Sequence, residues 1–148
     1  GISRKATNYK HIKPYDWSHL KRLLHQENID VVVNLCGETI GQPWYHWSRK
    51  KIYDSRITTT TNIVSQLGNL PIHLINASGV GIYPCTEQLN QVHYSEETSV
   101  IRTNCFLQSL AYDWEQAALN HANTTVLRTA VVIKKNDGVL QKLMMRHQ

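Results

Sequence analysis

The amino-acid sequence predicts an α/β fold in which parallel strands alternate with helices. Three apolar runs bounded by polar segments indicate buried strands at residues 29–35, 71–78 and 124–133. Segments with helical periodicity separate these runs, and strands that alternate with helices form parallel β-α-β units with right-handed crossovers. The expected architecture is therefore a parallel sheet flanked by helices, within a single domain of 148 residues.

Three helices are predicted around these strands. The first lies in WSHLKRLLHQ, where three leucines form an apolar stripe and Asp16 can cap the amino end. The second spans residues 48–67, between the first two strands. The third lies in TNCFLQSLAYDWEQAALNH, before the last strand, and its apolar side chains recur at helical spacing.

The composition argues against several classes of protein. No apolar run approaches the roughly 20 residues of a membrane span, and the opening GISRKATNYK does not have the pattern of a signal peptide. Cys36, Cys85 and Cys105 show no C-x-x-C spacing, so neither a disulfide framework nor a metal site is expected. A reduced, cytoplasmic location is the resulting prediction.

The net charge of +5 raises the question of nucleic-acid binding. The lysines and arginines are scattered along the chain rather than striped along one face. The charge pattern therefore indicates a mildly basic surface that could carry an anion site, and no nucleic-acid partner is expected.

The ends of two predicted strands indicate where a ligand would bind. In open parallel sheets the ligand crevice lies beyond the carboxyl ends of the strands, which is where NLCG and NASGVG fall. The G-x-G-x-x-G loop that follows the first strand of a dinucleotide fold has no counterpart here. GVGIYP follows the wrong strand and lacks the third glycine, while the opening ISRK has the character of the end of a second strand.

A series of motifs then suggests a family. DVVVNLCGETI, WYHWSRKKIYDSRITTTT, NASGVGIY, SEET, FLQSLAYDWEQAA, VLRTAVVI and DGVLQK follow one another along the chain. In this order they resemble the sugar-nucleotide-epimerase-like branch of the extended short-chain dehydrogenase/reductases. The resemblance implies a partial Rossmann-type domain over residues 1–148 that binds NADP or NAD. It also implies that the family's first strand, glycine loop and carboxyl-terminal substrate domain are missing from these residues, so cofactor binding by this truncated chain is itself in question.

The resemblance places part of a cofactor site at the ends of the first two strands. A small residue and a glycine in NLCG would let the backbone approach a ribose or a pyrophosphate, although an ordinary strand-to-loop turn is the alternative. The residues concerned are Asn34, Leu35, Cys36, Gly37, Ala77 and Ser78.

Four further residues are candidates for cofactor contacts by the same resemblance. Arg4 and Lys5 stand where a basic side chain accepts an adenosine 2′-phosphate, although a basic tail is equally consistent. Asp16 stands where the family places adenine contacts, but it also suits a helix cap. Arg56 lies in the second helix on the crevice side, where it needs an anionic partner such as a cofactor phosphate or a carboxylate.

The catalytic pattern of the superfamily is incomplete. These enzymes generally use a Ser or Thr at a strand end and a Tyr-x-x-x-Lys pair on the next helix, but the aligned positions hold Leu107 and Ala111. If catalysis occurs, Ser78 and Tyr83 are the candidates for contacting a substrate oxygen. Arg128, in an apolar strand, is expected to pair with an acidic side chain.

Two functions from different classes follow. The first is an NAD(P)-binding, epimerase- or reductase-like protein with weak or no activity, whose partners are a dinucleotide and a small-molecule substrate. The second is a non-enzymatic interaction or regulatory module built on a Rossmann remnant. In either case the VVVNL strand would carry an unpaired apolar edge, which predicts a homo-oligomer.

Overall fold

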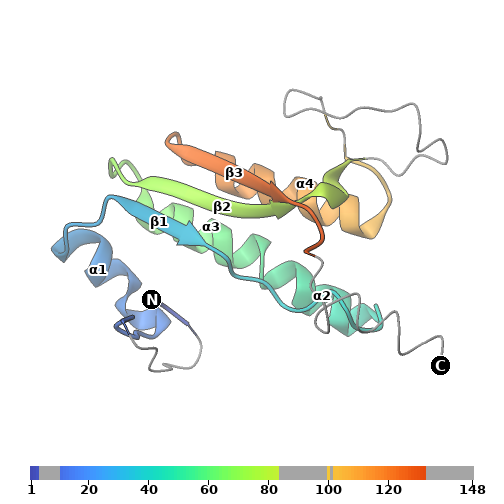
Figure 1. Ribbon diagram of the computed structural model, residues 1–148, viewed down its shortest axis with the longest axis horizontal. Helices are drawn as coiled ribbons and strands as arrows, with labels where there is room; N and C mark the ends of the chain where they lie inside the picture. The colour runs from blue at the N-terminus through green and yellow to red at the C-terminus, as the bar shows by residue number, and fades with distance from the viewer. Residues whose placement is uncertain (4–10, 84–99, 101, 133–148) are drawn as a thin grey trace.

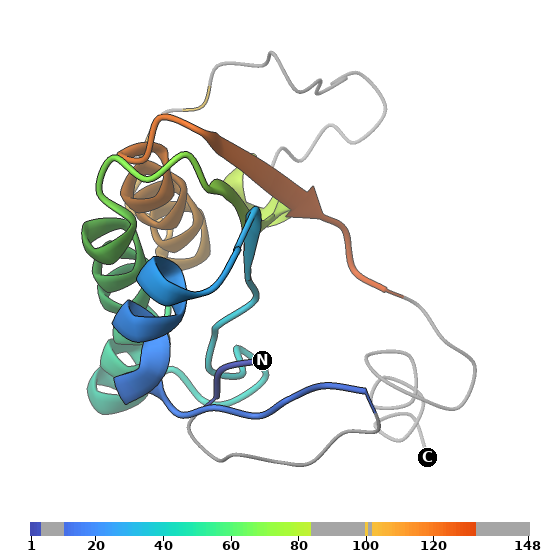
Figure 2. The same ribbon diagram turned by 90° about the vertical axis from the view of Figure 1, so that its left-hand side faces the viewer.

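A three-stranded parallel sheet forms the centre of the molecule. The computed structural model describes residues 1–3, 11–83, 100 and 102–132. The strands are β1 (Val31–Asn34), β2 (His73–Gly79) and β3 (Thr124–Thr129), in the order β1-β2-β3. The helices of the described residues lie on one side of this sheet (Figures 1 and 2). The predicted α/β class with a parallel sheet is confirmed.

The helices follow the predicted order, with one difference. The structure has a 3-10 turn η1 followed directly by α1, then α2 and α3 in place of one long helix, a second turn η2, and α4. Their bounds are η1 Trp17–His19, α1 Leu20–Gln26, α2 His46–Asp54, α3 Ile57–Leu67, η2 Val80–Ile82 and α4 Phe106–Leu119.

The single helix predicted over residues 48–67 is wrong, because the chain breaks its helical pattern at Ser55 and Arg56. The Arg56 amide donates to the carbonyl of Tyr53, three residues back, instead of four. Both side chains at the break bind the loop that follows β1: the Ser55 hydroxyl accepts from the Glu38 amide at 2.8 Å, and Arg56 Nη1 donates to the Glu38 carbonyl at 2.9 Å. Periodicity alone carries no signal for such a contact with a distant loop.

The amino-terminal segment agrees in part with its predicted strand character. Ile2 forms an isolated parallel bridge with Tyr15, as two neighbouring strands would. Asp16 caps the turn η1, since its carboxylate accepts from the Ser18 amide at 2.8 Å. Hydrogen bonds from Ser18 and His19 lower the pKa of Asp16 to about 2. Arg4 and Lys5 lie outside the described residues.

The apolar core lies between the sheet and the helices that cover it. Leucines of α1, an isoleucine and a leucine of α3, and a leucine of β2 pack together there, and burial of such side chains is the main favourable term in folding. The fully buried members of this cluster are Leu20, Leu24, Ile63, Leu67, Ile72, Leu74 and Ala118.

A row of buried polar side chains joins four elements beside this core. The strand register pairs Asn34 of β1 with Asn76 of β2. Asn34 Nδ2 donates to Asn76 Oδ1 at 2.7 Å and to Thr60 Oγ1 of α3 at 2.8 Å. The Thr60 hydroxyl also accepts from Trp114 Nε1 of α4 at 2.9 Å. These bonds explain why a threonine, a poor helix former, occupies the middle of α3.

Replacing Thr60 with valine tests this row. The change keeps the shape of the side chain but removes the hydroxyl oxygen that accepts from Trp114 Nε1 and from Asn34 Nδ2. The indole N–H is then left without its acceptor, and the Asn34 amide loses one of its two. We expect a loss of roughly 1–3 kcal/mol in the free energy of unfolding, measured with urea. The matched control is Thr61→Val at the exposed neighbouring position, which should stay within about 0.5 kcal/mol. Equal losses in the two variants would contradict the role of the row.

Candidate functional site

An open groove of about 800 Å³ lies where the chain leaves β1. Its walls come from the amino-terminal segment, the turn η1, the loop after β1 and the helix α2. Parallel sheets bind ligands beyond the carboxyl ends of their strands, and ligand pockets commonly measure 300–1,000 Å³. The lining residues are Gly1, Ile2, Ser3, Trp17, Val33, Leu35, Cys36, Gly37, Glu38, Lys51, Asp54, Ser55 and Thr59.

The groove brings together segments that the sequence singled out separately. Leu35, Cys36 and Gly37 line it directly. Ser3 lines it immediately before Arg4 and Lys5 in the chain, and Trp17 lines it immediately after the capping residue Asp16. Three predicted contact regions therefore meet at one surface. The cofactor contacts of the individual residues stay predictions.

Asn34 contributes to the groove by fixing the conformation of the loop after β1. Its side chain is buried and bonds with Thr60 of the helix α3 and Asn76 of the strand β2. Its Oδ1 accepts from the Cys36 amide at 3.2 Å, which fixes the first turn of the loop after β1. The side chain thus supports the wall of the groove from behind.

Arg56 lies directly beneath Gly37. A Cβ atom on Gly37 would lie 2.9 Å from the Arg56 guanidinium carbon, so the glycine leaves the space that the guanidinium fills. Arg56 Nη1 donates to the carbonyls of Glu38 at 2.9 Å and Ile52 at 3.3 Å, and the guanidinium stacks 5.2 Å from the Trp114 ring. Within the part of the chain that the structure describes, no carboxylate makes a salt bridge with it. Burial lowers the pKa of Arg56, and the nearby Glu38 charge offsets part of this effect.

A second polar cluster lies at the ends of β2 and β3, where the register pairs Ser78 with Arg128. Arg128 forms a two-point ion pair with Glu115 of α4, at 2.9 Å from Nε and 2.8 Å from Nη2. The expected acidic partner of Arg128 is therefore present. The hydrogen bonds that Arg128 donates to the Glu115 carboxylate are the main cause that raises the pKa of Arg128. Sequence reasoning did not single out Glu115, although a carboxylate on the apolar stripe of a helix is itself a signal of a buried ion pair.

Both candidate catalytic residues belong to this cluster. Ser78 was expected to face an open crevice, but it is only 5% exposed and its hydroxyl donates to Glu115 Oε1 at 2.7 Å. This expectation of an open side chain is wrong, because Ser78 lies on the face of β2 that packs against α4. The Tyr83 hydroxyl accepts from Arg128 Nη1 at 3.0 Å. Ala77 lies on the opposite face of β2 and is half-buried.

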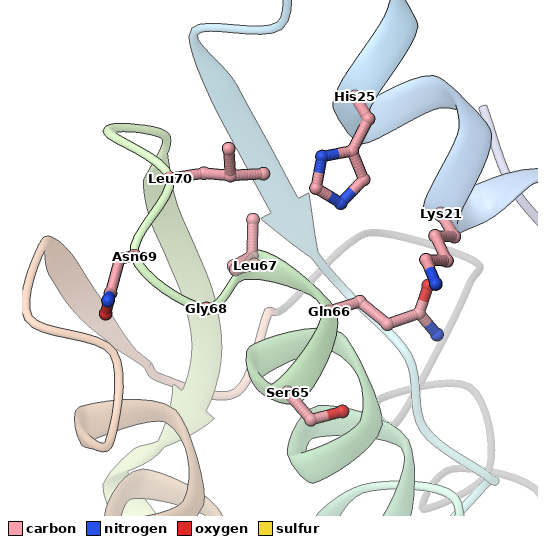
Figure 3. A pocket seen from close by; sticks show the side chains of 8 residues that line it. All are labelled: Lys21, His25, Ser65, Gln66, Leu67, Gly68, Asn69 and Leu70. Atoms are coloured by element: carbon pink, nitrogen blue, oxygen red, sulfur yellow. The ribbon is translucent and has the colours of Figure 1, made fainter.

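The remaining surfaces of the described residues add little to this picture. A pocket of about 510 Å³ lies between α1 and the end of α3, near the amino ends of the strands (Figure 3). None of the residues singled out from the sequence lines it.

In the described ranges, no three His, Cys, Asp or Glu side chains are grouped to hold a metal ion. No helix within these ranges has the length and apolar character to span a membrane.

Two curated relatives resemble the chain in sequence. An epimerase family protein of Mycobacterium leprae is 35% identical over 122 residues, which are 78% of this chain and 38% of the relative. An epimerase family protein of Staphylococcus haemolyticus is 29% identical and matches 99% of this chain and 50% of its own length. The chain thus spans at most half the length of these relatives.

Two solved structures share the fold. The human epimerase family protein SDR39U1 (isoform 2), solved with NADPH, superposes with a TM-score of 0.75 at 22% identity and covers 97% of this chain and 49% of its own. The nucleoside-diphosphate sugar epimerase of Corynebacterium glutamicum superposes with a TM-score of 0.69 at 25% identity. The match covers 97% of this chain and 30% of the epimerase chain. The Rossmann-type fold expected from the motifs is confirmed.

A family model covers nearly the whole chain and agrees with the resemblance seen in the motifs. The matched segment runs from residue 2 to residue 137. It includes the loop after β1, the end of β2 and the Arg128 strand, which carry the groove and the polar cluster. The chain therefore belongs to the NAD dependent epimerase/dehydratase family.

Proposed function

We propose that this chain is one partial nucleotide-binding domain of an epimerase- or reductase-like protein in the cytoplasm, and that its groove binds NADP. The observation that carries the proposal is the groove at the end of β1, which gathers Ser3, Trp17 and the Cys36-Gly37 turn. The groove has the size of a ligand site and lies at the end of the sheet where such folds bind nucleotides. The human relative was solved with NADPH, which supports the same class of ligand here.

The preference for NADP over NAD rests on charge. Arg4 and Lys5 directly follow Ser3, which lines the groove. An arginine fork suits the oxygens of a 2′-phosphate, whereas NAD recognition uses a carboxylate on the free ribose hydroxyl. No acidic residue stands in the ISRKATNYK segment. Two charge-assisted contacts would favour NADP by roughly 2–4 kcal/mol.

Cofactor titrations test this preference. We expect the parent chain to bind NADPH more tightly than NADH, followed through tryptophan fluorescence because Trp17 lines the groove. Arg4→Ala should reduce the ratio of the two affinities at least about tenfold. Lys21→Ala, on α1 beside the pocket of Figure 3, is the control and should leave the ratio unchanged. Equal affinities of the parent chain for both cofactors would contradict the proposal.

The proposed chemistry places Ser78 and Tyr83 against a substrate oxygen. Ser78 lies at the carboxyl end of β2 and Tyr83 follows this strand. Glu115 and Arg128 link their hydroxyl groups into one chain of hydrogen bonds. The substrate class is a small molecule with a hydroxyl or carbonyl group. A non-enzymatic role is the second candidate, and it is favoured by α4, where the buried Ala111 occupies one position of the usual Tyr-x-x-x-Lys pair.

The Ser78→Ala variant tests the chemical role. NADPH-dependent reduction by the parent would be screened against a panel of small carbonyl compounds, and the variant should lower turnover by roughly 10²-fold. Loss of the hydrogen bond to Glu115 should also cost about 1 kcal/mol of unfolding free energy, which a urea titration separates from catalysis. Ser65→Ala, at an exposed position of α3, is the control. Unchanged turnover would remove Ser78 from the active site, and NADPH binding without any turnover would favour the non-enzymatic candidate.

Self-association is proposed from the edge of the sheet. The His73 amide donates to the Asp30 carbonyl, so the alternation of a parallel ladder directs the backbone groups of Val31 and Val33 away from β2. An apolar groove of about 320 Å³ runs along this edge, and Ile2 and the leucines of α1 are among the side chains that line it. Val31 and Val33 are 45% and 55% exposed. An unpaired apolar edge of this kind favours pairing with an extended segment of a second copy.

Light scattering at micromolar concentration tests the assembly. The parent chain should form a dimer or a larger species. Val33→Pro removes an outward N–H without removing a bond between β1 and β2, so it should shift the protein toward the monomer. Val126→Pro, whose N–H points outward from the other edge at β3, is the control and should leave the assembly intact. A stable monomer of the parent chain would overturn this proposal.

A further inference from the structure

The groove at the end of β1 contains a lysine that the motifs did not single out. Lys51 of α2 lines the groove together with Cys36 and Gly37. Two carboxylates also line it, on Glu38 and Asp54. Asp54 Oδ2 accepts from Lys50 Nζ at 2.5 Å, so the charge of this carboxylate is balanced by the neighbouring lysine rather than by Lys51.

The surroundings of Lys51 leave its charge uncompensated. Its Nζ lies 5.4 Å from the centre of the Trp47 ring, an aromatic contact that orients the ammonium group without neutralising it. Across the described ranges, Lys51 makes no salt bridge with a carboxylate. The guanidinium of Arg56, beneath Gly37, is held by the backbone carbonyls of Glu38 and Ile52. Lys51 is therefore the side-chain cation that the described wall of the groove offers to an anion.

We propose that Lys51 binds the pyrophosphate of the dinucleotide. The inference rests on the proposed function and adds a second phosphate contact to it. Lys51 belongs to α2, whereas the basic pair expected at the 2′-phosphate follows Ser3 on the amino-terminal segment. A compact ammonium charge suits a pyrophosphate, and Lys51 shares the groove with the loop at the carboxyl end of β1, where parallel sheets bind their ligands.

This assignment separates two kinds of phosphate recognition. The pyrophosphate occurs in both NAD and NADP, whereas the 2′-phosphate occurs only in NADP. Removing a pyrophosphate contact should weaken both cofactors by a similar factor, and removing a 2′-phosphate contact should weaken NADP alone. Lys51 and Arg4 are therefore distinguishable by the ratio of the two affinities, independently of any enzymatic activity.

Calorimetric titration of the full chain with NADPH and with NADH is the test, because it avoids the fluorescence of Trp47 next to Lys51. We expect Lys51→Ala to weaken both cofactors about tenfold or more, and Lys51→Arg to recover most of the loss. Arg49→Ala is the matched control, since Arg49 lies on the same helix but stacks on the Phe106 ring and does not line the groove. It should change either affinity less than about twofold.

The possible results distinguish this inference from the proposed function. Unchanged affinities in Lys51→Ala, while the parent binds cofactor, would overturn the role of Lys51 and leave the groove as the binding site. A loss of affinity for NADPH alone would also overturn it, because Lys51 would then contact the 2′-phosphate. A parent chain that binds neither NADPH nor NADH at millimolar concentration would overturn both the inference and the proposed function.

Discussion

The hydrogen bonds of the Asn34 side chain are the constraint on which the groove depends. Asn34 ties the end of β1 to Asn76 of β2 and Thr60 of α3, and Trp114 of α4 binds the same threonine. The remaining oxygen of Asn34 accepts from the Cys36 amide and so sets the direction in which the chain leaves the sheet. Because every member is buried, an unpaired group in this row would cost more than a solvent-exposed bond contributes. The loop that lines the groove is therefore built onto the most tightly specified part of the fold.

The loop is held from its other side by Arg56. Burying a guanidinium is unfavourable unless its donors are satisfied, and here backbone carbonyls and an aromatic face replace the carboxylate that a buried arginine usually meets. This arrangement suits a glycine at position 37, since a Cβ there would lie 2.9 Å from the guanidinium carbon and Arg56 would have to shift. It also interrupts the helical pattern, because the side chains of Ser55 and Arg56 both turn toward the loop. The contacts of Ser55 and Arg56 with this loop thus explain the break between α2 and α3.

The sequence predicted the strands, their parallel order and the helix faces, because local periodicity determines these features. The family resemblance predicted that NLCG and Asp16 belong to a ligand surface. Leu35, Cys36 and Gly37 line the groove, and so does Trp17, the residue after Asp16. Sequence reasoning missed the break at Ser55, the burial of Ser78 and the ion pair of Glu115, since each depends on a partner far away in the chain. It also extended the last strand to residue 133, whereas β3 ends at Thr129, where β2 offers no further partner beyond Gly79.

The polar cluster at the ends of β2 and β3 explains why the proposal of nucleotide binding has more support than the proposal of catalysis. A Tyr-x-x-x-Lys pair works because the lysine places a positive charge beside the phenol. Arg128 also lies beside a phenol, that of Tyr83, but Glu115 binds this arginine at two points and compensates its charge. The Ser78 hydroxyl donates its hydrogen bond to the same carboxylate. The cluster therefore contributes first to joining β2, β3 and α4, and proton transfer at Tyr83 would proceed without the net charge that the lysine supplies. Among the described residues, no carboxylate forms a salt bridge with Lys51 in the groove at β1. The proposed binding of an anionic nucleotide there is therefore independent of whether the cluster can do chemistry.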